Sequence, residues 1–325
     1  MHRLSIIAII SLLLLLFGCN PNRRTPEVID LKPAAEFIVD SAYSFIKKQV
    51  DFGPRIPSTE GHLLCGNFLV SRLESYGVSV SEQVDTLVGY DGKVYPLRNI
   101  IGSINAAAHN RILLCAHWDS RPFADQAAEN QNHPIDGAND NASGVAVLLE
   151  IARTIHQMPP TIGVDFVFFD LEDQGRPAYD VTADPNDHGY CLGSKYWAEN
   201  FVGTKPKYGI LLDMVGAEDA VFTLEGNSML YAQKEIERIW DLGTQLGYQQ
   251  YFQYNRTHVV FDDHLHINNI AQIPCVDIIH HDSETASKFW TKWHTHEDGL
   301  DIIHKPTVKA VGQTLVQLIY NESEL

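Results

Sequence analysis

Apolar runs and segments with helical periodicity follow each other along the chain after residue 35. The runs that predict strands are 99–104, 111–117, 164–170, 208–216, 220–226 and 273–279. The segments whose apolar positions repeat three and four residues apart predict helices over 36–49, 60–76, 142–157, 228–246 and 306–320. Several runs are apolar throughout, as is typical of strands covered on both faces. The pattern therefore predicts an α/β fold with a mostly parallel sheet between two layers of helices.

The N-terminal residues differ from this pattern. Arg3 precedes a short apolar run over 6–17, as in a signal peptide, and the run is too short for a membrane-spanning helix. "LFGC" resembles a bacterial lipobox, in which Cys19 is lipidated and becomes the mature N-terminus. We therefore predict a lipoprotein signal peptide (1–18), a tether (19–35) and an envelope protein that is lipid-anchored and faces the periplasm or the cell surface. The alternative is a plain secretory signal with an incidental cysteine.

Composition and charge narrow the class of protein. The 325 residues are 45% hydrophobic and 20% charged, which is ordinary for a globular enzyme. A formal net charge of −17 argues against a nucleic-acid partner, because phosphate binding requires a basic face. Cys65, Cys115, Cys191 and Cys275 show no C-x-x-C spacing, which argues against a cysteine zinc site. We expect buried free thiols, although an exported chain permits disulfides.

Histidine and carboxylate side chains stand at the carboxyl ends of predicted strands, where α/β sheets bind ligands, or in glycine-rich turns. They are His117 in "CAHWDS", Asp140 in "GANDNASG", Asp173 in "FFDLEDQG", Asp213 in "LLDMVG" and His294 in "WHTHEDGLD". Singly, each carboxylate could cap a helix or lie in a solvated turn. Together, nitrogen and carboxylate ligands without thiolate indicate zinc in a catalytic site. A divalent cation would also explain why "DLED" places carboxylates so close together.

At this point the chain resembles a known family. The segments "AHWDS", "GANDNASG", the acidic pair after "VFF", "LLDMVG" and "HTHEDGLD" resemble the zinc aminopeptidases with co-catalytic metals and the related glutaminyl cyclases. The resemblance runs from "FGPRIPSTEGH" to the last predicted helix. It implies a single zinc-exopeptidase-like α/β domain over 36–325 with a central mixed sheet.

Three local features resemble the glutaminyl cyclases more than the aminopeptidases. Trp293 precedes the last ligand, as in the cyclases' Trp-His-Thr motif. The acidic pair is Glu172-Asp173, where the peptidases typically have two glutamates. "FDDHLHINNIAQIPCVDII" resembles the cyclases' Asp-Asp-His stretch, although many peptidases have a similar Ser-Asp-His. The expected activity is therefore cyclisation of an N-terminal glutamine to pyroglutamate with release of ammonia, on peptide or protein substrates.

The resemblance also implies roles for individual residues. One zinc ion would be held by Asp140, Asp173 and His294. Glu172 would transfer protons, Asp213 would hold the substrate amine or the leaving nitrogen, and Asp263 would join their proton network. Trp293 would form a pocket wall, and Asp119 would orient His117. Because His117 and Asp213 are both present, a second zinc at these residues stays possible.

Two other interpretations stay open. An aminopeptidase would use two zinc ions to activate water, with Glu172 as the general base. A non-catalytic binding domain should have lost ligands, and none is missing. The segment 174–194 is rich in Pro, Asp, Asn and Gly, which predicts a loop. It could shape access to the pocket or be a solvated insertion.

Overall fold

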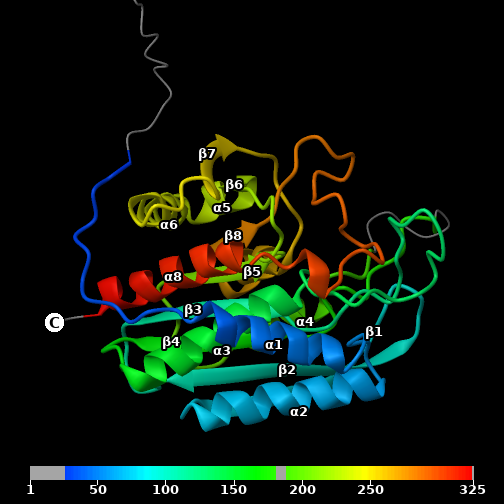
Figure 1. Cartoon of the computed structure of the whole chain (residues 1–325). Coiled ribbons are helices and arrows are strands. Elements are labelled where there is room, and N and C mark those ends of the chain that lie inside the picture. The colour runs from blue at the N-terminus through cyan, green and yellow to red at the C-terminus, as the bar shows by residue number, and fades with distance from the viewer. Residues whose placement is uncertain (1–25, 181–187, 324–325) are drawn as a thin grey trace, which may run out of the picture.

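The computed structural model describes residues 26–180 and 188–323 (Figure 1). Its central sheet has the strand order β1-β2-β4-β3-β5-β8. The strands are β1 (Ser79–Val88), β2 (Val94–Ile104), β3 (Arg111–His117), β4 (Gly163–Phe169), β5 (Gly209–Asp213) and β8 (Cys275–Ile279). β1 and β2 pair antiparallel with each other, as do β2 and β4, and the other pairings are parallel. The predicted α/β domain with a mixed, mostly parallel sheet is confirmed.

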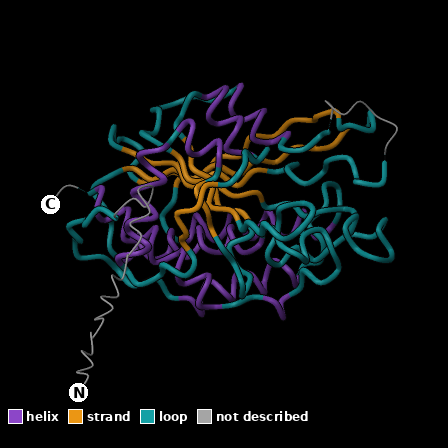
Figure 2. Tube along the Cα trace, turned by 90° about the horizontal axis from the view of Figure 1, so that it is seen from above, coloured by secondary structure: helices purple, strands orange, loops and turns teal. Residues whose placement is uncertain are grey.

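Helices cover both faces of this sheet (Figure 2). The helices are α1 (Val39–Asp51), α2 (Glu60–Ser75), α3 (Ala142–Gln157), α4 (Leu192–Glu199), α5 (Gly226–Tyr231), α6 (Gln233–Gln245), α7 (Asp263–His266) and α8 (Lys305–Glu322). A π-helical turn η1 (Ile267–Ala271) and a 3-10 turn η2 (Leu300–Ile302) complete the helical elements, and β6 (Phe222–Leu224) pairs with β7 (Phe252–Arg256) outside the main sheet.

The inner strands are buried on both faces because successive side chains point to opposite sides. In β3, Leu114 and Ala116 join the large core on the side of α1, α3 and α8, whereas Leu113 and Cys115 join a smaller core with α4 and η1. This two-sided burial explains why the strand is apolar at almost every position. It also leaves the carboxyl end of each inner strand as the place where polar side chains can gather.

Some elements differ from the sequence prediction. The helix expected over 228–246 is two helices, because the chain leaves α5 at Ala232, which has φ −139° and ψ 40°. The strand expected over 220–226 shortens to β6 and lies outside the main sheet. β1 was not predicted, because most of its side chains are exposed and it has no continuous apolar face.

The cysteines of the described chain match the expectation. Cys65, Cys115, Cys191 and Cys275 are buried free thiols.

Cys19 and the predicted signal peptide lie outside the described residues. Within the described ranges, no helix combines the length and the apolar character needed to cross a bilayer.

Candidate active site

A pocket of about 370 Å³ opens at the carboxyl ends of the inner strands. Its floor carries the carboxylates of Asp140, Glu172, Asp173, Asp213 and Asp262, together with His294. Its walls are mainly apolar and aromatic: Tyr190, Met214, Val259, Val260, Phe261, Ile279, Phe289 and Trp293. A pocket that combines apolar and aromatic walls with convergent polar groups is the usual form of a small-ligand site.

The sheet brings the predicted ligands together from distant parts of the sequence. His117 is the last residue of β3, and Asp213 is the last residue of β5. Asp173 follows β4, and Asp140 lies in the turn before α3, where the Asn141 side chain caps the helix by accepting from the Gly144 N–H. Because β3, β4 and β5 run parallel, their carboxyl ends share one edge of the sheet.

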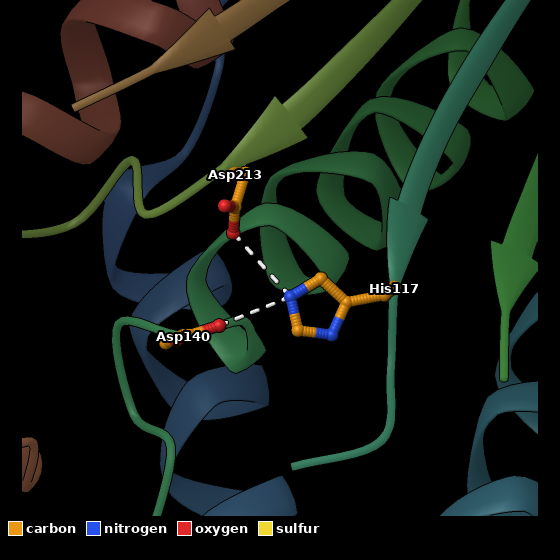
Figure 3. A group of neighbouring side chains, drawn as sticks. All are labelled: His117, Asp140 and Asp213. Atoms are coloured by element: carbon orange, nitrogen blue, oxygen red, sulfur yellow. Dashed lines mark ion pairs between the residues drawn. The ribbon is translucent and has the colours of Figure 1, made fainter. Parts of the chain in front are cut away.

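Asp140 joins two clusters of possible ligands. Its Oδ1 lies 3.0 Å from His117 Nε2, and the same nitrogen lies 3.4 Å from Asp213 Oδ1 (Figure 3). Its Oδ2 lies 3.7 Å from His294 Nε2, which is 3.1 Å from Asp173 Oδ1. Within each cluster the three ligand atoms lie within 4.8 Å of one another. The five residues that the sequence singled out therefore form two adjacent sites that share one carboxylate.

These residues fit a divalent cation. His117 Nε2 lies between two carboxylates, although a ring nitrogen has only one proton to donate. Asp173 Oδ2 is buried and accepts no hydrogen bond from the described residues. Buried acceptors without partners are costly, and a cation would satisfy them. The donor set of histidine nitrogens and carboxylate oxygens suits zinc.

Residues behind the ligands hold them in place, as is common in metal sites. Asp125 Oδ1 lies 3.1 Å from His294 Nδ1, and the Arg121 guanidinium donates to both oxygens of Asp125 at 3.2 and 2.9 Å. Asp298 accepts from the backbone N–H groups of Asn139 and Asp140 at 2.7 and 3.0 Å. The sequence analysis missed all three supporting residues, because nothing local distinguishes them from surface charges.

Asp119 supports a ligand and the acidic pair at once. Its Oδ1 lies 3.5 Å from His117 Nδ1. The same carboxylate accepts the backbone N–H groups of Glu172 and Asp173 at 3.2 and 3.0 Å. Asp119 therefore fixes the chain after β4 relative to the end of β3.

Burial among carboxylates shifts the proton affinities of the site. Burial raises the pKa of Glu172 well above its usual value, and the charges of Asp173 and Asp263 add to this, against the effect of His117. Burial also raises the pKa of Asp213 to about 6, against its hydrogen bond with His117. A bound divalent cation would oppose these shifts, because it favours the charged carboxylates.

Two consecutive aspartates at the start of α7, Asp262 and Asp263, have different surroundings. Asp262 lines the pocket, whereas Asp263 is fully buried behind it. Burial raises the pKa of Asp263 well above its usual value, and the neighbouring charge of Asp262 adds to the shift. Asp262, which the sequence analysis did not select, is thus the member of the pair that reaches the pocket.

Trp293 forms a wall beside the ligands. Its ring stacks on His294 with centroids 3.7 Å apart and an interplanar angle of 24°. Phe289 also packs against Trp293, with ring centroids 4.8 Å apart. His294 has φ 54°, in the left-handed region that non-glycine residues rarely adopt, and Met214 beside Asp213 has φ 50°. Strained backbone of this kind is concentrated at functional sites.

The segment after the acidic pair contributes to the pocket rim. His188 and Tyr190 line the pocket, and the loop ends where α4 begins at Leu192, slightly earlier than predicted. Residues 181–187 of this segment lie outside the described chain.

Comparison with known proteins agrees with this geometry. Residues 99–319, which contain all five candidate ligands, match the description "Peptidase family M28". The chain belongs to peptidase family M28. A glutaminyl cyclase from Bacteroides thetaiotaomicron, solved with N-acetylhistamine, superposes with a TM-score of 0.86 at 46% identity, covering 89% of this chain and 99% of that one. The glutaminyl-peptide cyclotransferase of Bothrops jararaca is 28% identical over 80% of this chain and 75% of its own.

Other solved structures carry a different name at almost the same similarity. A leucine aminopeptidase precursor from Bacteroides thetaiotaomicron superposes with a TM-score of 0.85 at 44% identity, covering 90% of this chain and 99% of that one. Overall similarity therefore establishes the M28 fold and family. The choice between cyclisation and hydrolysis has to come from the residues around the pocket.

Proposed function

We propose that this M28 protein is a zinc-dependent glutaminyl-peptide cyclotransferase, which converts an N-terminal glutamine into pyroglutamate and releases ammonia. The observation that carries the proposal is the aromatic wall of Trp293, stacked directly on His294 beside the ligand cluster. Such a wall suits a glutamine side chain folded back on its own amine. The test is whether a peptide that begins with Gln releases ammonia when the purified protein is added.

Asp140, Asp173 and His294 would hold the zinc ion. When bound there, zinc would supply Lewis-acid polarisation of the γ-carbonyl oxygen of the substrate. The substrate's own α-amine is the nucleophile, so the pocket has to hold amine and amide carbon together. Proximity of this kind can lower a barrier by about 7–11 kcal/mol in well-oriented reactions.

Glu172 is the proposed proton carrier. It lines the pocket next to the ligand cluster, with Oε2 4.0 Å from His117 Nε2. The amine nitrogen forms a bond to the amide carbon and gives its proton to Glu172. The C–N bond of the amide then breaks, and Glu172 returns the proton to the leaving nitrogen, which departs as ammonia. Both transfers require a carboxylate whose pKa lies near the working pH.

Asp213 and Asp263 complete the proposed proton network. Asp213 faces the pocket, where its carboxylate can hold the amine or the leaving nitrogen. Asp263 is fully buried and would join this network by exchanging a proton with it. In a single-zinc enzyme, His117 and Asp213 stay free of metal, and His117 contacts both Asp140 and Asp213 (Figure 3).

A di-zinc aminopeptidase is the second candidate, because the cluster of His117, Asp140 and Asp213 is complete. Glu172 would then activate water for hydrolysis of the first peptide bond. The two functions differ in their products: an aminopeptidase releases a free N-terminal residue, whereas the cyclase leaves the chain intact.

Replacement of Trp293 by Ala should raise KM for a Gln peptide about tenfold, because the loss of one aromatic contact of about 1.4 kcal/mol corresponds to a factor of ten. Trp293→Phe keeps an aromatic wall and should stay close to the wild type. Steady-state kinetics measure the effect, and equal melting temperatures exclude misfolding. Wild-type kinetics in Trp293→Ala would remove the main support for the cyclase.

The N-terminal residues support an anchored location. We propose that the chain is processed before Cys19, lipidated there and held at the bacterial envelope, where exported or surface peptides are its substrates. "LFGC" after the apolar run supports this. Cys19→Ala should move the protein from the membrane fraction to the soluble fraction after export, as seen by immunoblot. An unchanged membrane fraction in this variant would contradict lipidation at Cys19.

A further inference from the structure

Two neighbouring segments meet at Glu172. The thiol of Cys191 donates to Glu172 Oε1 at 3.2 Å, and the backbone N–H of Cys191 donates to the Glu172 carbonyl oxygen at 2.9 Å. The neighbouring residues form a second backbone hydrogen bond between the same two segments, in which the Leu192 N–H donates to the Leu171 carbonyl oxygen at 3.1 Å. Cys191 thus holds both the backbone and the side chain of the proposed proton carrier.

The fold fixes the position of Cys191. It is fully buried, has φ 58° and lies directly before α4, which packs on η1, α7 and β2. Leu171, on the opposite segment, also has a left-handed φ of 57°. Burial raises the pKa of the Cys191 thiol well above its usual value, so the sulfur keeps its proton and acts as a donor.

The surroundings explain why Glu172 needs such a donor. Its carboxylate, the Cys191 sulfur and an Asp262 oxygen lie within 4.8 Å of one another. Among the described residues that line the pocket there is no lysine or arginine. Without a donor, repulsion from Asp262 would favour other rotamers of Glu172, which has rotatable bonds along its side chain.

We propose that Cys191 is a positioning residue for Glu172: its S–H bond holds Oε1 and leaves Oε2 on the side of His117 and the ligand clusters. This inference rests on the proposed role of Glu172 as the group that carries the proton. Cys191 is not among the described residues that line the pocket, so its effect is on the orientation of the base.

The test compares two variants at Cys191. Both keep the Cβ atom, so the steric strain of a non-glycine residue at this left-handed position is the same as in the wild type. Cys191→Ala removes the donor and should lower kcat on a Gln peptide about tenfold, less than the roughly hundredfold loss that a 1 Å misplacement can cause. Cys191→Ser keeps a donor and should recover most of this loss. KM should stay close to the wild type in both variants, because the pocket walls are unchanged. Cys65→Ala is the control: Cys65 is equally buried but belongs to α2, away from the pocket.

Two outcomes would overturn the inference. One is a wild-type kcat in Cys191→Ala. The other is an equal loss of kcat in the Ser and Ala variants together with an equal drop in melting temperature, which would show a purely structural role. If the wild type releases N-terminal residues and does not cyclise, the proposed function is wrong. The same comparison on a Leu peptide then still tests Cys191, because hydrolysis would also use Glu172 as the base.

Discussion

Replacement of Glu172 by Gln lowers kcat for a Gln peptide about 10²- to 10⁴-fold, the range that general acid–base catalysis contributes. Gln has nearly the same shape as Glu but cannot accept the amine proton. Because zinc is assigned to Asp140, Asp173 and His294, the variant keeps the zinc content of the wild type. Kinetics and elemental analysis of the same preparation measure both quantities.

A matched control separates this effect from a general change of charge. Glu218 is exposed and lies outside the pocket lining, so Glu218→Gln should leave kcat unchanged. Loss of zinc from Glu172→Gln would mean that Glu172 is a ligand and that the base is another residue. A kcat within a few-fold of the wild type would exclude Glu172 as the proton carrier.

Replacement of Asp140 by Asn removes the bound zinc and lowers kcat about a thousandfold or more. Each oxygen of Asp140 faces a different cluster, at 3.0 Å from His117 Nε2 and 3.7 Å from His294 Nε2. An amide in its place turns one ligand oxygen into an NH₂ group. Lewis-acid stabilisation is worth several kcal/mol, and about 1.4 kcal/mol corresponds to each tenfold of rate.

Asp213→Asn is the contrasting variant for this prediction. In a cyclase with one zinc at Asp140, Asp173 and His294, it should keep the full zinc content of the wild type while kcat falls. In a di-zinc peptidase it should lose about half of the metal, because Asp213 would be a ligand only in the cluster with His117. A wild-type zinc content in Asp140→Asn would contradict the assignment of both clusters.

The sequence predicted the buried elements well and the exposed ones poorly. The bounds of β3 and α3 agree with the predicted 111–117 and 142–157, because both elements are buried at almost every position and are therefore mostly apolar. The ten-residue strand β1 was missed, because its valines stand four residues apart among mostly polar residues, and two of them, Val84 and Val88, are exposed. Its place in the sheet depends on pairing with β2, which local sequence does not show.

The residues of the candidate site also differ in how well the sequence predicts them. The five residues proposed as ligands could be selected because each stands at a strand end or in a glycine-rich turn, where an isolated polar residue is conspicuous. Asp125 supports His294 from 169 positions away in the sequence, and Asp298 holds the Asp140 turn from 158 positions away. Contacts of this range follow from the tertiary fold and leave no local pattern.

The most direct test of the account uses the purified protein, residues 20–325, with an equimolar mixture of two peptides that differ only in an N-terminal Gln or Leu. Mass spectrometry follows both peptides in the same tube. The account predicts that the Gln peptide loses the mass of one ammonia and that the Leu peptide stays intact. Release of free leucine, or of free glutamine with shortening of the Gln peptide, would contradict it and identify the pocket as that of an aminopeptidase.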